Sequence, residues 1–361
     1  MKYKRLFSLS IGLTCSATAL ASTFTCLDST PILSKEVNQA LLEKHAQNGQ
    51  PIVVNDESIR HPDLLLSFLN DEVRLCTSYV EDMSDLFATH FHRDKHHPQT
   101  VVASLIASRK LETIDVNPNL SDWDTRKVTN MSGMFDGAIA FNQPIGDWDT
   151  SKVTNMYGMF WDARTFNQPI GNWNTSKVTN MQSMFIEAND FNQPIGNWNT
   201  SKVTNMQSMF MRAASFDQPI ANWNTSKVTN MEDMFMGATN FDQPIKKWNT
   251  SKVTNMKNMF NEATQFWKTI GIKEPDHEVD IQSVRHYIDI HALTSIVSSL
   301  KDKLKQAQNI ELILVPKISQ MAADLAKEQL ALIEHQQASL SNNEPKNTLE
   351  NNKRKLDQVR D

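Results

Sequence analysis

The feature that most constrains this chain is a repeat of 25 residues. Six tryptophans follow one another at this interval without a slip: Trp123, Trp148, Trp173, Trp198, Trp223 and Trp248. The residues between them repeat as well. A stretch beginning at Phe166 reads FNQPIGNWNTSKVTNMQSMF, and close copies begin at Phe141, Phe191, Phe216 and Phe241. A period of about 20–50 residues is typical of architectures in which one unit cannot bury its own apolar face, so the sequence predicts a stack of units.

Each unit combines a helical spacing with a short extended segment. In the unit 142–166, apolar residues recur at the spacing of a helix face: Val153, Met156, Met159, Phe160 and Ala163. The segment 143–148 contains a proline, and we expect a brief strand there whose equivalents stack in parallel. Ile145 and Trp148 are expected to turn inward. The sequence therefore predicts one short strand and one short helix in every repeat.

The repeats divide the chain into five parts. These are a leader over 1–21, a helical N-terminal region over 22–110, the repeats over 111–270, a helical segment over 271–340 and a disordered polar tail over 341–361. Residues 80–87 share the spacing of 128–135, which predicts a degenerate first repeat inside the N-terminal region. The tail has too few apolar residues to order itself.

The segment 279–340 carries apolar residues at helical spacing, and we expect Pro316 to divide it into two helices. One interpretation is a cap over the open end of the array, because a terminal repeat exposes one of its faces. The other is a coiled-coil arm through which the chain forms a homo-oligomer, although no strict heptad persists.

The first 21 residues have the features of a secretory signal. Basic residues precede an apolar stretch, and Ala19-Leu20-Ala21 supplies the small residues expected before cleavage at Ser22. Cys15 raises the alternative of a lipid anchor, but it lies inside the apolar stretch. No apolar run of about 18 residues follows, so we expect no integral membrane segment after cleavage. The expected location is the periplasm, the cell surface or the medium.

Two cysteines remain after this cleavage, Cys26 and Cys76. In an exported chain, a single disulfide between them is the natural expectation, and it would tie the mature N-terminus to the folded region. The alternative is a pair of free thiols.

The repeated residues resemble those of the BspA-like leucine-rich-repeat surface proteins of bacteria, in the branch whose 25-residue unit reads W-N-T-S-K-V-T-N-M-x-x-M-F-x-x-A-x-x-F-N-Q-P-I. The match covers about 111–270. The resemblance implies an α/β solenoid, a leucine-rich-repeat-like right-handed stack of short parallel strands and short helices, with α-helical flanks. It also implies export and a role in adhesion or protein binding, and it brings no catalytic residues.

Two amide columns are identical from unit to unit. The asparagines are Asn130, Asn155, Asn180, Asn205, Asn230 and Asn255, and the glutamines are Gln143, Gln168, Gln193, Gln218 and Gln243. A polar strip that binds glycans is one interpretation. The other is structural, because stacked amides can bond to one another and to buried turn backbone.

A third column is cationic and consists of Lys127, Lys152, Lys177, Lys202, Lys227 and Lys252. Like charges about 5 Å apart repel one another unless they are solvated or paired. Such a stripe could bind sulfated or acidic polymers. The alternative is a row of solvated lysines that keeps the array soluble.

The columns that vary are the candidates for recognition. On a helical wheel, the residue after the invariant Met-Phe pair of each unit points away from the apolar face, and four consecutive units place a large apolar residue there. The predicted ligand-binding residues are Tyr157, Trp161, Ile186, Met211, Arg212 and Met236. The alternative is that the helix ends before this column, which then packs against a loop.

Other chemistry finds little support in the sequence. A histidine cluster at His90, His92, His96 and His97 could bind a transition metal, but no cysteine lies nearby and a solvated loop is the simpler interpretation. G-x-S-x-G, H-E-x-x-H and phosphate-binding motifs are absent, so we expect neither an enzyme nor a metal or cofactor site. The formal charge of −5 lacks the basic excess typical of nucleic-acid-binding proteins.

We therefore expect an exported bacterial repeat protein that binds a protein or a surface glycan, as an adhesin does. The first alternative is a structural envelope rod that self-associates through 279–340. The second is an enzyme with its site in 27–110, metal-dependent through the histidine cluster.

Overall fold

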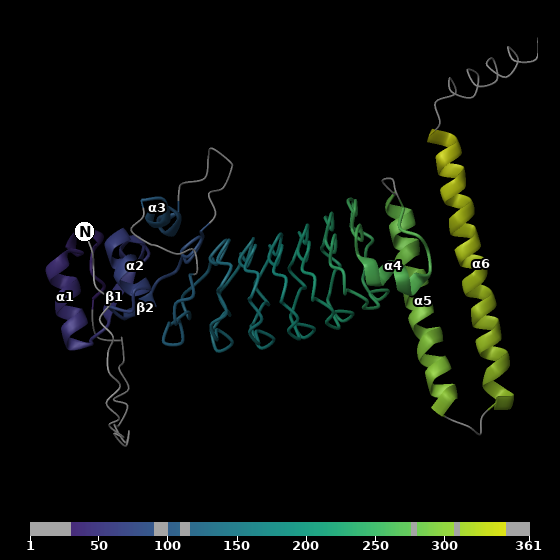
Figure 1. Cartoon of the computed structure of the whole chain (residues 1–361), viewed down its shortest axis with the longest axis horizontal. Coiled ribbons are helices and arrows are strands. Elements are labelled where there is room, and N and C mark those ends of the chain that lie inside the picture. Colours follow the sequence, from purple (N-terminus) through teal and green to yellow (C-terminus); the bar gives the residue numbers. More distant parts are fainter. Residues whose placement is uncertain (1–29, 90–99, 109–115, 276–279, 307–310, 344–361) are drawn as a thin grey trace, which may run out of the picture.

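The computed structural model describes residues 30–89, 100–108, 116–275, 280–306 and 311–343. Along its length lie a small N-terminal unit of helices and two strands, a row of stacked coils, and three C-terminal helices (Figure 1). The predicted leader lies outside the described residues, as does the predicted tail from residue 344 onward.

The N-terminal unit contains helices α1 (Gln39–Asn48), α2 (Pro62–Leu69) and α3 (Val101–Ala107), strands β1 (Ile52–Asn55) and β2 (Leu75–Tyr79), and 3-10 turns at Ser34–Glu36 and Ser58–Arg60. The strands pair in parallel, with Ile52 opposite Leu75 and Val53 opposite Cys76. Most strand residues are buried, as is usual for parallel strands. Their apolar side chains belong to the same continuous core as those of the stacked coils.

From Asp82 onward the chain stacks as coils. Parallel bridges join residues 25 positions apart, in the column Asn130, Asn155, Asn180, Asn205, Asn230 and Asn255. Asp82 bridges Asn130 across a longer interval, so residues 80–89 form the first coil. Successive coils lie directly over one another, and equivalent residues form columns along the stack (Figure 1).

Backbone amides alternate between two roles along each turn segment. In one coil, every second amide donates to a carbonyl of the next coil at 2.7–3.0 Å; these residues are Met131, Gly133, Phe135 and Gly137. The amides between them close tight turns within the coil by donating to the residue three positions earlier, as in Met134, Asp136 and Ala138. This division satisfies backbone groups that the stack would otherwise bury without partners.

The helix predicted within each unit is not found in the described repeats, where turns take its place. A helix would direct these amides to carbonyls four residues earlier, whereas here they bond between coils. Two residues of a turn segment also have positive φ, such as Gly158 at 57° and Asp162 at 52°. The segment 143–148 is not assigned as a strand, since the parallel bridges lie in the asparagine column, although Ile145 and Trp148 are buried as predicted.

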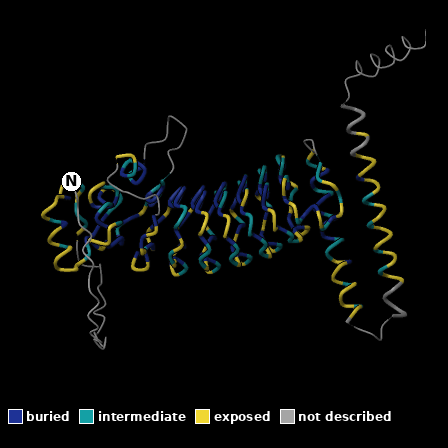
Figure 2. The backbone as a smooth tube through the Cα atoms, viewed as in Figure 1, coloured by how far each residue is buried: buried dark blue, intermediate teal, exposed yellow. Residues whose placement is uncertain are grey.

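Columns of aromatic rings fill the interior of the stack. Trp173 and Trp198 stack with ring centroids 6.4 Å apart and planes within 2° of parallel, and Phe185 lies 5.6 Å from Phe210. Indole Nε1 groups also bond between coils, as where Trp198 donates to the carbonyl of Ile170 at 3.1 Å. Buried residues recur at the same level in every coil, and exposed residues gather at the lower ends of the coils in this view (Figure 2).

The stack ends against helices α4 (Thr264–Ile270), α5 (Ile281–Gln306) and α6 (Glu311–Asn343), of which α5 and α6 lie side by side (Figure 1). Pro316 lies inside α6, so the prediction that it divides the segment is wrong. As the sixth residue of the helix, it removes one of the first intrahelical hydrogen bonds rather than ending the helix. Among the described helices, none combines the length and apolarity that crossing a bilayer requires.

Candidate functional site

The side chains of the asparagine column form hydrogen bonds within the stack. Asparagine Oδ1 accepts the amide two residues on, as Asn180 does from Gln182 at 3.1 Å. Asn155 Nδ2 donates to Asn130 Oδ1 at 3.2 Å, whereas Asn205 Nδ2 donates to Gln182 Oε1 at 2.6 Å. These bonds hold the turns and tie neighbouring coils together. Of the two interpretations of this column, the geometry supports the structural one.

The glutamine column has a similar role. Gln193 Nε2 donates to Asn167 Oδ1 of the preceding coil at 2.9 Å, and Gln218 Nε2 donates to Asn192 Oδ1 at 2.8 Å. Asn167 Oδ1 also accepts the backbone amide of Asn192 at 3.0 Å. The glutamine and asparagine side chains, which recur at the same spacing in successive units, therefore form contacts between coils.

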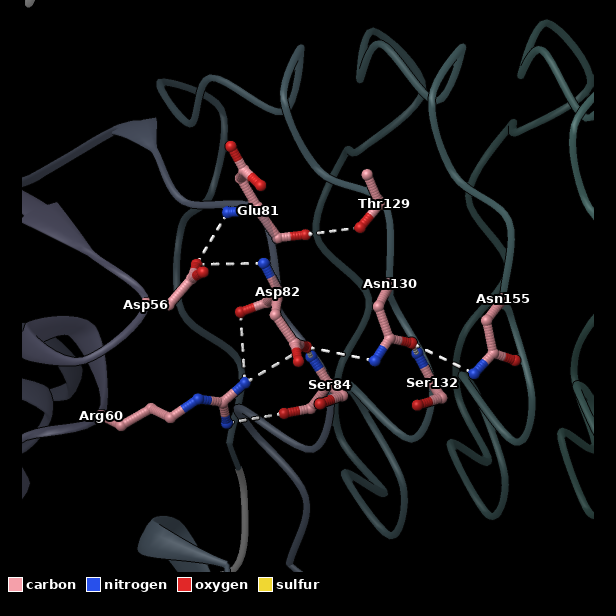
Figure 3. Close-up of polar contacts among 9 residues, drawn as sticks. All are labelled: Asp56, Arg60, Glu81, Asp82, Ser84, Thr129, Asn130, Ser132 and Asn155. Carbon is pink, nitrogen blue, oxygen red and sulfur yellow. Dashed lines mark hydrogen bonds and ion pairs between the residues drawn. The ribbon is translucent and has the colours of Figure 1, made fainter.

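Polar side chains close the N-terminal end of the stack (Figure 3). Asp56 Oδ1 accepts the backbone amides of Glu81 and Asp82 at 2.7 and 3.0 Å. Arg60 donates to the carbonyls of Ser84 and Asp82 at 2.7 and 3.2 Å. The Asp56 carboxylate and the Arg60 guanidinium thus bond to backbone groups of the first coil. In later coils, the preceding coil takes this role.

Sequence reasoning missed these capping residues because they lie outside the repeats. One signal was present, since the first coil has Asp82 where later coils have asparagine. Its carboxylate lies 3.5 Å from Arg60 Nη2 and also accepts from Asn130 Nδ2 at 3.3 Å (Figure 3). A charged residue at the end of an otherwise amide column therefore indicates a capping partner.

The C-terminal end is closed in a comparable way. Arg285 of α5 donates to the carbonyls of Thr250 and Val253 at 2.8 and 3.4 Å. Glu274 accepts the amide of Glu262 at 2.6 Å. The contacts of α5 match the cap interpretation of this segment, while α6 packs beside α5 (Figure 1).

The predicted recognition column lies only partly at the surface. Trp161, Met211 and Met236 are half-buried, while Ile186 is buried, with 4% of its surface exposed. The prediction that all four point outward is therefore wrong for Ile186. The helical wheel behind that prediction requires a helix, and the segment consists of turns instead.

Tyr157 and Arg212 flank this column. Tyr157 is half-buried, and Arg212 is exposed and donates to Glu187 Oε1 of the preceding coil at 2.9 Å. In the coil before that, Arg164 pairs with Asp162 at 2.6 Å, which raises the pKa of the Arg164 guanidinium. The variable positions thus bring half-buried apolar side chains, and ion pairs of which only the arginines are exposed, to one part of the coils.

The lysine column is exposed throughout. Within the described part of the chain, none of its six members forms an ion pair. Lys127 Nζ lies over the ring of Tyr79, 4.4 Å from its centroid. The four later members, Lys177, Lys202, Lys227 and Lys252, therefore present cations without an ion-pair partner among the described residues.

Two acidic residues stand beside the first lysines of this column. The pKa of Asp124 is lowered to about 2, mainly because the Arg126 guanidinium donates to its carboxylate at 2.7 and 2.9 Å. The pKa of Asp149 is lowered chiefly by hydrogen bonds from Ser151, with a further contribution from the charge of Lys152. Both carboxylates are therefore ionised at neutral pH and offset part of the positive charge nearby.

Several sequence predictions fall on residues that the structure does not describe. The histidine cluster at 90–97 and Cys26 lie outside the described residues. Cys76 is disulfide-bonded and lies buried on β2. Within the described ranges, no group of three or more metal-binding side chains comes together.

Three of the four large apolar side chains that are exposed in the described part of the chain lie on α5 and α6. These are Ile296, Leu330 and Ile333, with exposed fractions of 47%, 56% and 41%. A shallow groove of about 560 Å³ runs between α5 and the last coils, lined in part by Ile296, Ala221 and Lys247. The C-terminal helices therefore provide a second candidate surface.

Comparison with known proteins gives one family match. A model of the family described as "Mycoplasma protein of unknown function, DUF285" matches residues 104–213 and 193–305. The two overlapping ranges run from within α3, through the coils, to the penultimate residue of α5. No curated protein and no solved structure gives a significant match to the chain.

Replacing Asp124 with asparagine should flatten the acid dependence of stability. The lowered pKa means that the ionised carboxylate stabilises the fold above its unfolded pKa of about 3.9, and that this contribution is lost as the pH falls through about 2. Denaturant melts should show D124N less stable than the parent at pH 7, by on the order of 1 kcal/mol because the pair with exposed Arg126 is screened.

The two chains should become equally stable near pH 2. Asp149→Asn is the matched control, because later coils carry asparagine at this position and the pKa of Asp149 is lowered chiefly by Ser151, with only a minor contribution from the charge of Arg126; its effect should be smaller. Parallel pH profiles for D124N and the parent would contradict the role assigned to Asp124.

Proposed function

The chain belongs to the family described as "Mycoplasma protein of unknown function, DUF285", whose model matches more than half of it, and we propose that it is an exported repeat protein that binds a protein or a surface glycan. In this proposal, the stacked coils form a solenoid whose outer columns constitute the binding surface. The expected setting is the cell envelope or an interface with a host.

The supporting observation is that invariant and variable columns of the stack have different roles. Invariant positions are used by the stack itself: Phe185 and Trp198 in the aromatic core, Asn180 and Gln193 in bonds that hold turns and join coils. Several positions that vary between units lie where side chains reach the surface, as Tyr157 and Arg212 do, while Ile186 of the same variable columns is buried. Variable side chains at the surface of a fixed frame suit recognition of a partner.

The resemblance to BspA-like leucine-rich-repeat surface proteins supports the same proposal. It rests on the repeated W-N-T-S-K-V-T-N-M-x-x-M-F unit, and it would assign an adhesive role to a chain with a leader of the secretory type. Solenoids of this type commonly bind partners along an extended face.

A capture experiment with matched variants tests this proposal. The full chain is immobilised and exposed to surface extract from cultured host cells, beside Trp161→Ser/Met211→Ser/Met236→Ser. Ile186 is left unchanged because its substitution would disturb the core. We expect the triple variant to keep the parent's melting profile and to capture at least about tenfold less partner, since loss of central apolar contacts typically costs more than about 1 kcal/mol each.

The control is Ile296→Ser/Leu330→Ser/Ile333→Ser, which removes three exposed apolar side chains from α5 and α6 instead. It should capture as much partner as the parent. Equal capture by all three chains would place recognition elsewhere, and no capture by any of them would contradict a role in binding surface components.

The exposed apolar residues of α5 and α6 favour one alternative, a structural rod that self-associates through its C-terminal helices. This alternative predicts dimers of the parent in sedimentation experiments at micromolar concentration. Leu330→Glu/Ile333→Glu should then give monomers, because burying two carboxylates in an apolar interface is unfavourable. A parent chain that is monomeric throughout would exclude this alternative.

A further inference from the structure

The lysine column has no structural task that would explain its recurrence. Its side chains are exposed in every coil, and those of the described part form no ion pairs. On either side of Lys177 in the sequence, the neighbours have defined roles: the Ser176 amide donates to Asn174 Oδ1 at 3.1 Å, and Val178 is buried in the core. The lysines themselves are available to a ligand.

Acidic residues accompany this column only at its N-terminal end. Three positions before each lysine, the chain has Asp124 and Asp149, followed by Asn174, Asn199, Asn224 and Asn249. Every one of these side chains performs the same task, accepting the amide two residues on: Asp149 from Ser151 at 2.9 Å, Asn199 from Ser201 at 3.1 Å. The turn needs an oxygen and not a charge.

A second column shows the same change. Five positions before the lysines of successive coils, the residues are Asp147, Asn172, Asn197, Asn222 and Lys247. All five are exposed. Acidic side chains of the later coils lie at other positions, such as Glu187 on the turn segment, which pairs with Arg212, and Asp217 directly after Phe216. Within the lysine column and these two neighbouring columns, therefore, the charge changes along the stack from mixed to positive alone.

We propose that this edge binds a linear sulfated or otherwise strongly anionic polysaccharide, through a lysine ladder formed by Lys177, Lys202, Lys227 and Lys252. The inference deepens the proposed function, on which it rests, by naming the ligand class and the surface. Parallel neighbours are about 4.8 Å apart, so the ladder spans about 14 Å and matches several consecutive charged groups of an extended polymer.

The surroundings of the ladder favour a glycan over other polyanions. Next to the lysines lie neutral, exposed hydroxyl and amide groups, such as Thr179 and Asn199, which suit the hydroxyls of sugars. The aromatic side chains that the variable columns bring to the surface, Tyr157 and Trp161, are half-buried, so they offer bases only a partial stacking platform. Among the described coil residues no large apolar side chain is fully exposed, so a membrane surface would find none ready to insert.

The test measures binding of a fluorescent, size-defined heparin oligosaccharide to the full chain by anisotropy. The variant Lys177→Gln/Lys202→Gln/Lys227→Gln/Lys252→Gln removes the ladder. A control of equal charge change, Lys35→Gln/Lys44→Gln/Lys301→Gln/Lys305→Gln, removes exposed lysines elsewhere. We expect the ladder variant to bind at least about tenfold more weakly, with a shallower dependence on salt between about 50 and 200 mM, because fewer counterions are released. The control should bind within about twofold of the parent.

Two further arms decide the ligand class. Chemically desulfated heparin should bind at least about tenfold more weakly than heparin, and single-stranded DNA of equal charge should also bind more weakly. Replacing the four ladder lysines with arginine should preserve binding, since the charge is kept. Equal losses in ladder and control variants, or DNA binding as tight as heparin binding, would overturn the inference. Absence of heparin binding, alongside partner capture that depends on Trp161 and Met211, would overturn the ladder proposal alone.

Discussion

Hydrogen bonds between equivalent positions of consecutive coils are the constraint on which the rest of the structure depends. Every second amide of the turn segment donates to the next coil, as Phe185 does to Met209 at 2.9 Å. These bonds hold coils in register, so a residue can only lie over its equivalent 25 positions away. Aromatic rings, amides and lysines consequently form columns, and a side chain in one coil always has its counterparts as neighbours.

A stack held in this way has two open ends, and the flanking segments satisfy their backbone groups. Asp56 and Arg60 serve the first coil, while Arg285 and Glu274 serve the last (Figure 3). Unpaired amides and carbonyls at an open end would otherwise offer a template for edge-to-edge association. The caps therefore oppose association of further chains at the ends of the stack. Recognition of a partner then takes place along its sides.

The 25-residue period predicts which residues share a column, and the observed bridges join those residues. It does not predict the path of the chain within a coil. Spacing of Met156, Met159 and Phe160 fits a helix, yet the same residues are buried by turns in which amides bond between coils and Asp162 takes a positive φ. A helical wheel cannot represent such turns, and for that reason it placed Ile186 at the surface.

The end caps could not be predicted from periodicity, because Arg60 and Arg285 lie outside the repeats. The lysine column was visible in the sequence, but its charge balance became meaningful only once Asp149 and Asn199 were seen to accept the same turn amide. Geometry shows that the fold needs only the oxygen at this position. A change from aspartate to asparagine therefore alters the charge of the surface and keeps the hydrogen bond of the turn.

The most direct test of the account is the removal of one whole unit. Deleting residues 167–191 joins Phe166 to Asn192 and keeps every column in register, whereas deleting 167–178 breaks the register at the same place. Denaturant unfolding followed by circular dichroism should show a cooperative transition for the first chain, with a smaller m-value than the parent because less surface is exposed on unfolding. The second chain should lose that transition. Loss of cooperative unfolding in both deletions, or its retention in both, would contradict the claim that register between coils determines this fold.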